Sequence, residues 1–330
     1  MMNCGSDRPG EFELIAELFA PLATASGAFG LRDDAAIATP PAGHDLVVTA
    51  DALVEGVHFF TTDPPELIAR KALRVNLSDL AAKGCIPSGY LLTLSLPSRI
   101  DARWLRAFAN GLAQDQAAFG ISLLGGDTTA TPGPLSIAIT AFGHAPQGKL
   151  LRRAGARPGD LVFVSGTLGD AGGGLACLKE EAGSFGATKR AYLIGRFQLP
   201  QPRIALGRAL LGVASASLDV SDGLVADLGH IGEASSVRVR IEAARIPLSS
   251  ALKALWDTSH DAIVRAATAG DDYEIAFTAP PENRETVRQA AAGSGIGVTE
   301  IGRCEAGQGV FLVRENGCEI PVTRRGYVHF

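Results

Sequence analysis

One arrangement recurs along the chain and limits the folds that it can adopt: an apolar segment runs into an aspartate that is flanked by Ser, Thr or Gly. It occurs at residues 46–51, 76–79, 121–129 and 218–223. Strand-like runs of this kind alternate with helical patterns, which is typical of mixed α/β folds. We therefore expect a scaffold that presents several carboxylates at the ends of its strands and helices.

The first half of the chain is a series of alternating strands and helices. After a short amphipathic helix near residues 14–22, the pattern predicts strand 46–50, a helix from Pro64 to Gly84, strand 90–96, helix 101–118, and strands 121–124 and 135–142. A Pro/Gly turn at residues 146–148 marks the boundary. We expect domains at residues 1–148 and 149–330.

The second half repeats the alternation less regularly. The pattern predicts strands at 159–166, 237–241 and 275–278, helices at 204–210, 224–234 and 282–292, and a surface loop at 180–190. The predicted fold class is α+β (mixed α/β) with two domains, and the C-terminal domain is expected to be an α/β sandwich.

The composition disfavours several classes of protein. A formal net charge of -5 makes nucleic-acid binding unexpected, since such proteins usually present a basic face. The five cysteines form no CxxC pair, the first residues lack the apolar core of a signal peptide, and no run approaches the roughly 20 apolar residues of a membrane span. We expect a cytoplasmic protein with no membrane and no nucleic-acid partner.

Each aspartate alone has an ordinary explanation, because Asp begins turns and caps helices. If several of them lie close together, bound cations must offset their repulsion, since two like charges about 4 Å apart repel by roughly 4 kcal/mol at an effective dielectric constant of 20. Oxygen ligands without neighbouring His or Cys suit Mg²⁺ or Mn²⁺, and Mg²⁺ usually completes its shell with water and substrate phosphates. The set consists of Asp33, Asp34, Asp51, Asp79, Asp127, Asp219 and Asp222.

Other candidate features are ambiguous on local grounds. The glycine-rich residues 166–174 follow a strand and could bind an anion, but they lack the GxxxxGK[ST] pattern, and close strand–helix packing explains them as well. Arg153 is either a phosphate contact or a solvated loop residue, and His58 either a functional or a structural histidine. No GxSxG serine and no Cys–His pair supports a covalent nucleophile.

Taken in order, a collinear series of motifs resembles the thiamine-monophosphate kinase family over essentially the whole chain. The wider superfamily includes aminoimidazole ribonucleotide synthetase and selenophosphate synthetase. The series is Gly10-Glu-Phe, Asp33-Asp34-Ala-Ala, Thr49-Ala-Asp51, Gly56-Val-His58-Phe, Asn76-Leu-Ser-Asp79, Gly125-Gly-Asp127-Thr-Thr, Asp219-Val-Ser-Asp222-Gly-Leu and Gly326-Tyr-Val-His-Phe330.

The resemblance implies ATP-dependent phosphorylation of thiamine monophosphate to thiamine diphosphate, with several Mg²⁺ ions and ATP as co-substrate. It also implies a homodimer in which the mixed sheets of the N-terminal domains join in a barrel. The implied metal ligands are Asp33, Asp34, Thr49, Asp51, Asp79, Asp127, Asp219 and Asp222. The implied ATP contacts are Gly126, Asp127, Arg153 and Ser221, and the implied thiamine-phosphate contacts are His58, Asp271 and Tyr327.

Three residues depart from the family pattern: Arg32 replaces a usual Gly, Ala50 a common Thr, and Asp271 a usual Glu. None of them removes a carboxylate from the metal set. Two alternatives stay open at this point. One is an ATP-dependent synthetase of the same superfamily acting on another small acceptor, and the other is a non-catalytic divalent-cation or nucleotide-binding protein.

Overall fold

The computed structural model describes residues 10–183 and 185–328, so the closing His329 and Phe330 of the last motif lie outside the described part. The contacts divide the chain into two compact units. The first unit comprises residues 10–80 and 86–147, and the second comprises residues 81–85 and 148–328. The predicted α+β fold class, with a mixed sheet in the N-terminal part, is confirmed.

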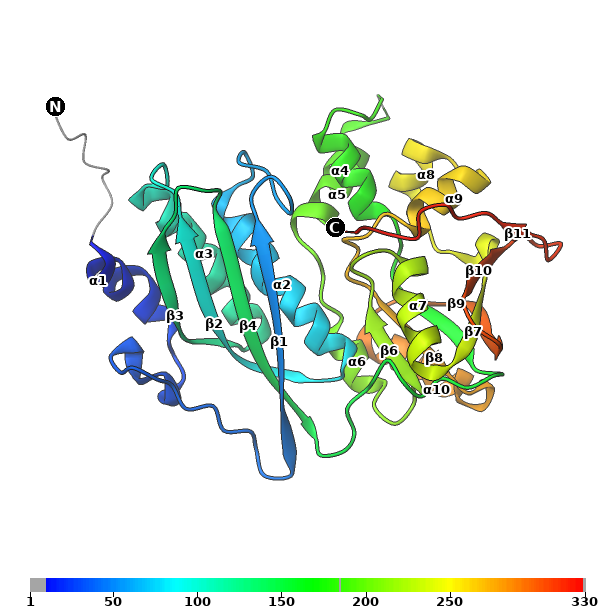
Figure 1. The fold of residues 1–330 in the computed structure, drawn as a ribbon, viewed down its shortest axis with the longest axis horizontal. Coiled ribbons are helices and arrows are strands. Elements are labelled where there is room, and N and C mark those ends of the chain that lie inside the picture. Colours follow the sequence, from blue (N-terminus) through cyan, green and yellow to red (C-terminus); the bar gives the residue numbers. More distant parts are fainter. Residues whose placement is uncertain (1–9, 184, 329–330) are drawn as a thin grey trace. The chain divides into compact units, whose positions relative to one another are not determined.

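The first unit is built on a four-stranded sheet in the order β1-β4-β2-β3. β4 is antiparallel to both β1 and β2, whereas β3 runs parallel to β2. Two long helices cover one face of this sheet, and the other face is left open (Figure 1). The strands are β1 (His44–Val54), β2 (Ile86–Leu96), β3 (Ser122–Ala130) and β4 (Ser136–Pro146), and the helices are α2 (Pro65–Ala82) and α3 (Ala102–Phe119).

A bulge interrupts the pairing of β2 with β3. Tyr90 pairs with Leu123, but Leu91 pairs with Gly125, so that Leu124 is an extra residue on β3. Before the sheet, the chain forms α1 (Glu11–Leu14), a π-helical turn (Ile15–Phe19) and two 3₁₀ segments (Ala20–Leu22 and Ser26–Leu31).

The start and end of α3 follow from its sequence. Asp101 caps the N-terminus, since its carboxylate accepts the Trp104 N–H at 2.8 Å, and Gly120 ends the helix with φ = 65°. Gly111 lets α3 approach α2 closely, because a Cβ there would lie 2.4 Å from the Glu66 carbonyl oxygen.

A buried ion-pair group also joins these two helices. The carboxylate of Asp115, in α3, accepts hydrogen bonds from Arg70 and Arg74 of α2, with Nε–O distances of 2.9 and 2.7 Å. The Asp115 side chain is 0% exposed and that of Arg74 is 6% exposed. Both charges are therefore largely shielded from water.

The second unit contains a seven-stranded mixed sheet in the order β11-β10-β7-β9-β5-β8-β6. Only the pair β10–β7 is parallel among the pairings of the described strands. The strands are β5 (Leu161–Ser165), β6 (Ala216–Asp219), β7 (Val237–Glu242), β8 (Ile275–Ala279), β9 (Val298–Ala306), β10 (Val310–Val313) and β11 (Glu319–Ile320).

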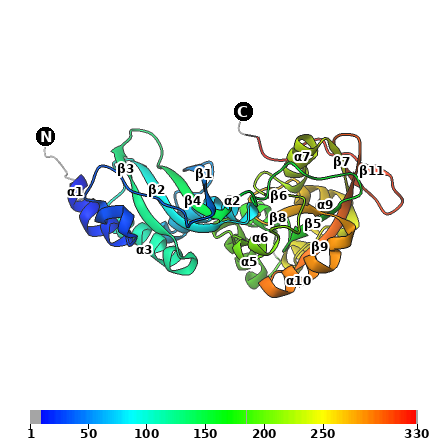
Figure 2. The ribbon, with the colours of Figure 1, turned by 90° about the horizontal axis from the view of Figure 1, so that it is seen from below.

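Helices cover both faces of the second sheet (Figure 2). α7 packs on one face with an aliphatic core that includes Leu218, Leu228 and Ile241, while α6 and α10 pack on the other around Phe163 and Phe277. The helices of this unit are α4 (Asp170–Leu178), α5 (Ala187–Gln198), α6 (Ile204–Ala209), α7 (Leu224–Ser235), α8 (Ser250–Trp256), α9 (His260–Ala267) and α10 (Arg284–Ser294).

Several predicted boundaries were wrong. β1 and β3 continue beyond their predicted ends, so Asp51 and Asp127 lie within strands rather than after them. α5 begins at Ala187, inside the predicted loop 180–190, and α8 and α9 were not predicted. No helix in the described part of the chain combines the length and apolar character that a membrane span needs.

Candidate active-site residues

The first cluster of predicted site residues joins β1 to α2. Alternation along β1 turns Thr49 and Asp51 toward the face that α2 covers, where Leu53 is buried. Thr49 Oγ1 donates a hydrogen bond to Asp79 Oδ2, in the last turns of α2. Burial, and then the neighbouring charge of Asp79, raises the pKa of Asp51 to about 6. The structure thus brings together three of the predicted metal ligands.

A second cluster lines a pocket of about 610 Å³ beside β3. The lining includes Asp33 and Asp34, from the segment before β1, and Gly126 and Asp127 of β3. It also includes Leu91, Thr93, Thr140 and Phe142, which belong to β2 and β4. Asp33, Asp34 and Asp127 are exposed to solvent, so this pocket presents three ionisable carboxylates from two segments that are distant in sequence.

The two clusters lie on the outer strands of the same sheet, with β4 and β2 between them. Three strand spacings correspond to about 14 Å. Within residues 10–183 and 185–328, no group of three or more His, Cys, Asp or Glu is close enough to hold a metal ion. A single chain therefore does not gather the predicted carboxylates of the first unit at one point.

The second unit gathers another group of predicted residues around the loop after β6. The Ser221 carbonyl accepts the Asp271 N–H at 2.7 Å, and the Asp222 carbonyl accepts the Tyr327 N–H at 2.9 Å. Asp219 ends β6 and is 7% exposed. Segments separated by about 50 and 100 residues in sequence thus meet at one loop.

Asp227, which the sequence analysis missed, supports this loop. Its Oδ2 accepts the N–H groups of Asp222 and Gly223, each at 3.0 Å. Burial and the charge of Asp222 raise the pKa of Asp227 to about 7, while the two N–H donors and the charge of Arg153 oppose that rise. Arg153 therefore lies near enough to Asp227 for its positive charge to act on that carboxylate.

His58 lies in the turn that follows β1 and belongs to neither cluster. Its Nδ1 accepts the Val54 N–H at 3.0 Å, and its carbonyl oxygen accepts a hydrogen bond from Lys71 Nζ at 2.9 Å. In the neutral ring the proton is then on Nε2.

Two departures from the family pattern fit the backbone. Arg32 has φ = -107°, so this position does not need the conformational freedom of glycine. Asp271 has φ = 60°, a left-handed conformation that Asp tolerates better than longer side chains. The backbone of this loop therefore accepts Arg32 in place of the glycine that is usual in the family.

The donor set fits a hard divalent cation. Burial and the repulsion by Asp79 raise the pKa of Asp51, and a cation beside the two carboxylates would oppose both effects. The donors there are carboxylate and hydroxyl oxygens, which Mg²⁺ prefers. The exposed carboxylates beside β3 and the loop after β6 offer the same chemistry.

Two family models match the chain: the AIR synthase related protein N-terminal domain over residues 32–145 and its C-terminal domain over residues 157–315. The fold and site thus define a member of the AIR synthase related class. The chain is 44% identical to the thiamine-monophosphate kinase of Caulobacter vibrioides, over 97% of this chain and 91% of that protein.

Solved structures agree with this relationship. The thiamine-monophosphate kinase of Stenotrophomonas maltophilia has a TM-score of 0.79 at 43% identity, covering 86% of this chain and 89% of that one. AaThiL, solved in complex with AMPPCP and TMP, has a TM-score of 0.78 at 33% identity and covers 97% of each chain. The chain belongs to the thiamine-monophosphate kinase family, and it is an enzyme, a kinase of the phosphotransferase class.

Proposed function

We propose that this chain transfers the terminal phosphoryl group of ATP to the phosphate of thiamine monophosphate, giving thiamine diphosphate and ADP. The observation that carries the proposal is the similarity, at 33% identity over 97% of both chains, to a protein solved with AMPPCP and TMP. AMPPCP replaces the oxygen between the β- and γ-phosphates of ATP with a methylene group. That complex thus pairs a donor analogue with an acceptor.

The residues suit a direct, in-line transfer. An acceptor phosphate is already an anionic nucleophile, so the site needs positioning and charge neutralisation more than a general base. Bound Mg²⁺ ions, held by Thr49 and the seven aspartates of the predicted set, would neutralise the crowded phosphates. Arg153 and the residues Gly126 and Ser221 would bind ATP. His58, Asp271 and Tyr327 would bind thiamine monophosphate.

We propose that the chain works as a homodimer, and two observations in the first unit support this. The open face of its sheet carries apolar side chains, including Leu46 and Val48, which are 40% and 53% exposed. The Asp51 and Asp127 clusters lie on opposite edges of the sheet, about 14 Å apart. A second copy could bring its β3 edge to the β1 edge of the first, so that each site takes Asp51 from one chain and Asp127 from its partner.

The proposed reaction is tested with purified protein, Mg-ATP and thiamine monophosphate, by measuring thiamine diphosphate. Asp51→Asn and Asp127→Asn should each lower turnover by a factor on the order of 100 or more. Glu13→Gln, which alters an exposed carboxylate of the same unit, should leave turnover unchanged. Absence of thiamine diphosphate while another acceptor is phosphorylated would refute the proposed acceptor.

Mixing the two inactive variants tests the shared site. In a mixed dimer one site combines both defects and the other has neither, so unfolding and refolding an equal mixture should restore about a quarter of the wild-type rate. If each chain held a complete site, every site would carry one defect and the mixture would stay inactive.

A further inference from the structure

Residues 270–274, which enter β8, have an unusual backbone. Gly270, Asp271 and Tyr273 all have positive φ, at 77°, 60° and 51°. For a side chain as large as Tyr this conformation costs on the order of 1–3 kcal/mol and persists only where the surroundings enforce it. Something in the second unit must therefore hold this segment.

The segment is tied to the loop after β6 by three backbone hydrogen bonds. Asp271 N–H donates to Ser221 O at 2.7 Å, Tyr273 N–H to Val220 O at 2.8 Å, and Val220 N–H to Glu274 O at 2.8 Å. Any shift of the segment would therefore move Asp271 and Ser221, which are a predicted substrate contact and a predicted ATP contact.

Alternate side chains of the segment point into the unit. Asp272 is 2% exposed and accepts the N–H groups of Gly169 and Ala171, at 2.7 and 3.3 Å, at the start of α4. A carboxylate suits this position because a helix N-terminus carries partial positive charge. The Asp272 carbonyl oxygen also accepts a hydrogen bond from Arg196 Nη2 at 3.3 Å.

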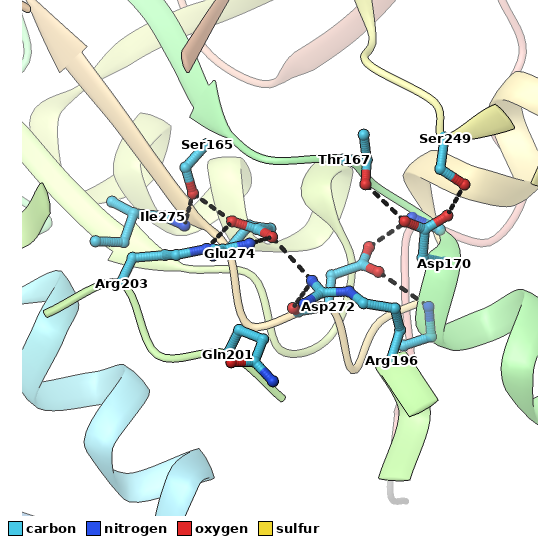
Figure 3. A network of polar contacts seen from close by, with 12 residues as sticks. Ser165, Thr167, Asp170, Arg196, Gln201, Arg203, Ser249, Asp272, Glu274 and Ile275 are labelled. Atoms are coloured by element: carbon cyan, nitrogen blue, oxygen red, sulfur yellow. Dashed lines mark hydrogen bonds and ion pairs between the residues drawn. The ribbon is translucent and has the colours of Figure 1, made fainter. Parts of the chain in front are cut away.

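Glu274 is held from three sides (Figure 3). It is 0% exposed, and its carboxylate accepts hydrogen bonds from Ser165 Oγ at 2.6 Å, from Arg196 Nη2 at 2.8 Å and from Arg203 Nε at 2.7 Å. Arg203 Nη2 makes a further hydrogen bond to it. Ser165 Oγ in turn accepts the Ile275 N–H at 2.8 Å, which fixes the start of β8.

We propose that Asp272 and Glu274 are positioning residues for the acceptor substrate. They fix residues 270–274 so that Gly270, Asp271 and Tyr273 keep their positive φ and Asp271, on the other side of the segment, lies beside the loop after β6. This inference rests on the proposed function, since the role of Asp271 in binding thiamine monophosphate is part of that proposal. It assigns a task in substrate binding to two buried carboxylates, which act through the backbone of residues 270–274.

Asp272→Asn and Glu274→Gln test this. An amide supplies one acceptor oxygen where the carboxylate supplies two, so one N–H donor or guanidinium group loses its partner. Because a displacement of about 1 Å at a reacting group costs on the order of 100-fold, we expect the KM for thiamine monophosphate to rise at least tenfold, and more than the KM for ATP. Arg203→Lys, which keeps the charge but loses the paired hydrogen bonds, should have a smaller effect of the same kind. It also keeps the test available if Glu274→Gln fails to fold.

Asp160→Asn is the matched control. Asp160 is 4% exposed and accepts hydrogen bonds from the Arg157 N–H and from Ser215 Oγ, neither of which lies in residues 270–274. We expect this variant to lower thermal stability with both KM values unchanged.

The outcomes separate the inference from the proposed function. If the wild type forms no thiamine diphosphate, the proposed function is wrong, and the inference that rests on it is wrong as well. If the wild type is active and Asp271→Ala raises the KM for thiamine monophosphate, the function stands. In that case, unchanged KM values in Asp272→Asn and in Arg203→Lys or Glu274→Gln, with losses only in stability or kcat, would overturn the inference.

Discussion

Replacing Asp115 with Ala should destabilise the first unit strongly. The Asp115 carboxylate accepts three hydrogen bonds from Arg70 and Arg74, at 2.7 to 2.9 Å. Without it, two guanidinium groups lose their counter-charge, and one of them is only 6% exposed. Removing one partner of a buried pair costs about 3–5 kcal/mol, because the remaining charge stays buried without compensation.

Urea denaturation followed by tryptophan fluorescence measures this cost. The chain has two tryptophans: Trp104 in α3 and Trp256 in α8. A Trp256→Phe background therefore makes the signal specific to the first unit. With a denaturant slope of about 2 kcal/mol per M, a loss of about 4 kcal/mol lowers the midpoint by about 2 M.

An exposed ion pair on the same helix provides the control. Arg106 of α3 contacts Glu17 at 2.7 Å, but the two side chains are 52% and 45% exposed. Exposed pairs contribute about 0–1 kcal/mol, so Glu17→Ala should shift the midpoint by less than about 0.5 M. Similar shifts in the two variants would refute the argument that burial of the charges sets the cost.

Two further predictions concern packing and pH. Gly111→Ala should cost about 1–3 kcal/mol of unfolding free energy despite the better helix propensity of Ala, because its Cβ would lie 2.4 Å from Glu66 O. Gly195→Ala, in α5, has no atom within 4 Å of the added Cβ, so it should instead raise the unfolding free energy by about 0.5–1 kcal/mol. Both changes in unfolding free energy are measured from the urea midpoints. If the two variants shifted the midpoint in the same direction, the reasoning would be contradicted. The raised pKa of Asp227, about 7 against 3.8, means that the folded chain holds a proton that the unfolded chain releases. The stability that this protonated carboxyl group contributes is therefore full below about pH 4 and is lost as the pH rises to 7. Without metal, the wild type should lose stability relative to Asp227→Asn over that range. A stability difference between the two proteins that does not change with pH would rule this out.

The sequence predicts an element well where its signals are local. α3 was expected at 101–118 and occupies Ala102–Phe119, because its apolar period, the Asp101 cap and the terminal glycine all lie within the helix or beside it. β1 and β3 were underestimated for the opposite reason. Backbone pairing with β4 continues along all of β1, from His44 to Val54, and it needs no apolar side chain at Asp51.

In the site, too, features with local sequence signals were predicted and contacts between distant segments were not. The grouping of Thr49, Asp51 and Asp79 agrees with the motifs, since each segment carries its own recognisable residues. The pairing of Glu274 with Arg203 joins positions 71 residues apart. Neither segment shows locally which partner it will meet, so this network was not predicted. The short helices α8 and α9 carried a usable signal, because Ser249 and Ser259 cap them.

The bulge at Leu124 decides on which face of the sheet the Asp127 side chain lies. With the bulge, Asp127 pairs with Thr93, which is exposed; with regular pairing from Tyr90 onward it would pair with Leu94, which is 0% exposed. Since side chains alternate between the two faces of a sheet, losing the bulge while keeping every residue would turn every later side chain of β3 over. A strand paired in this way would keep the motif Gly-Gly-Asp-Thr-Thr intact and yet point its carboxylate at the helices. In this strand, the backbone conformation at Leu124, and not the motif alone, sets the face of the sheet on which the Asp127 carboxylate lies.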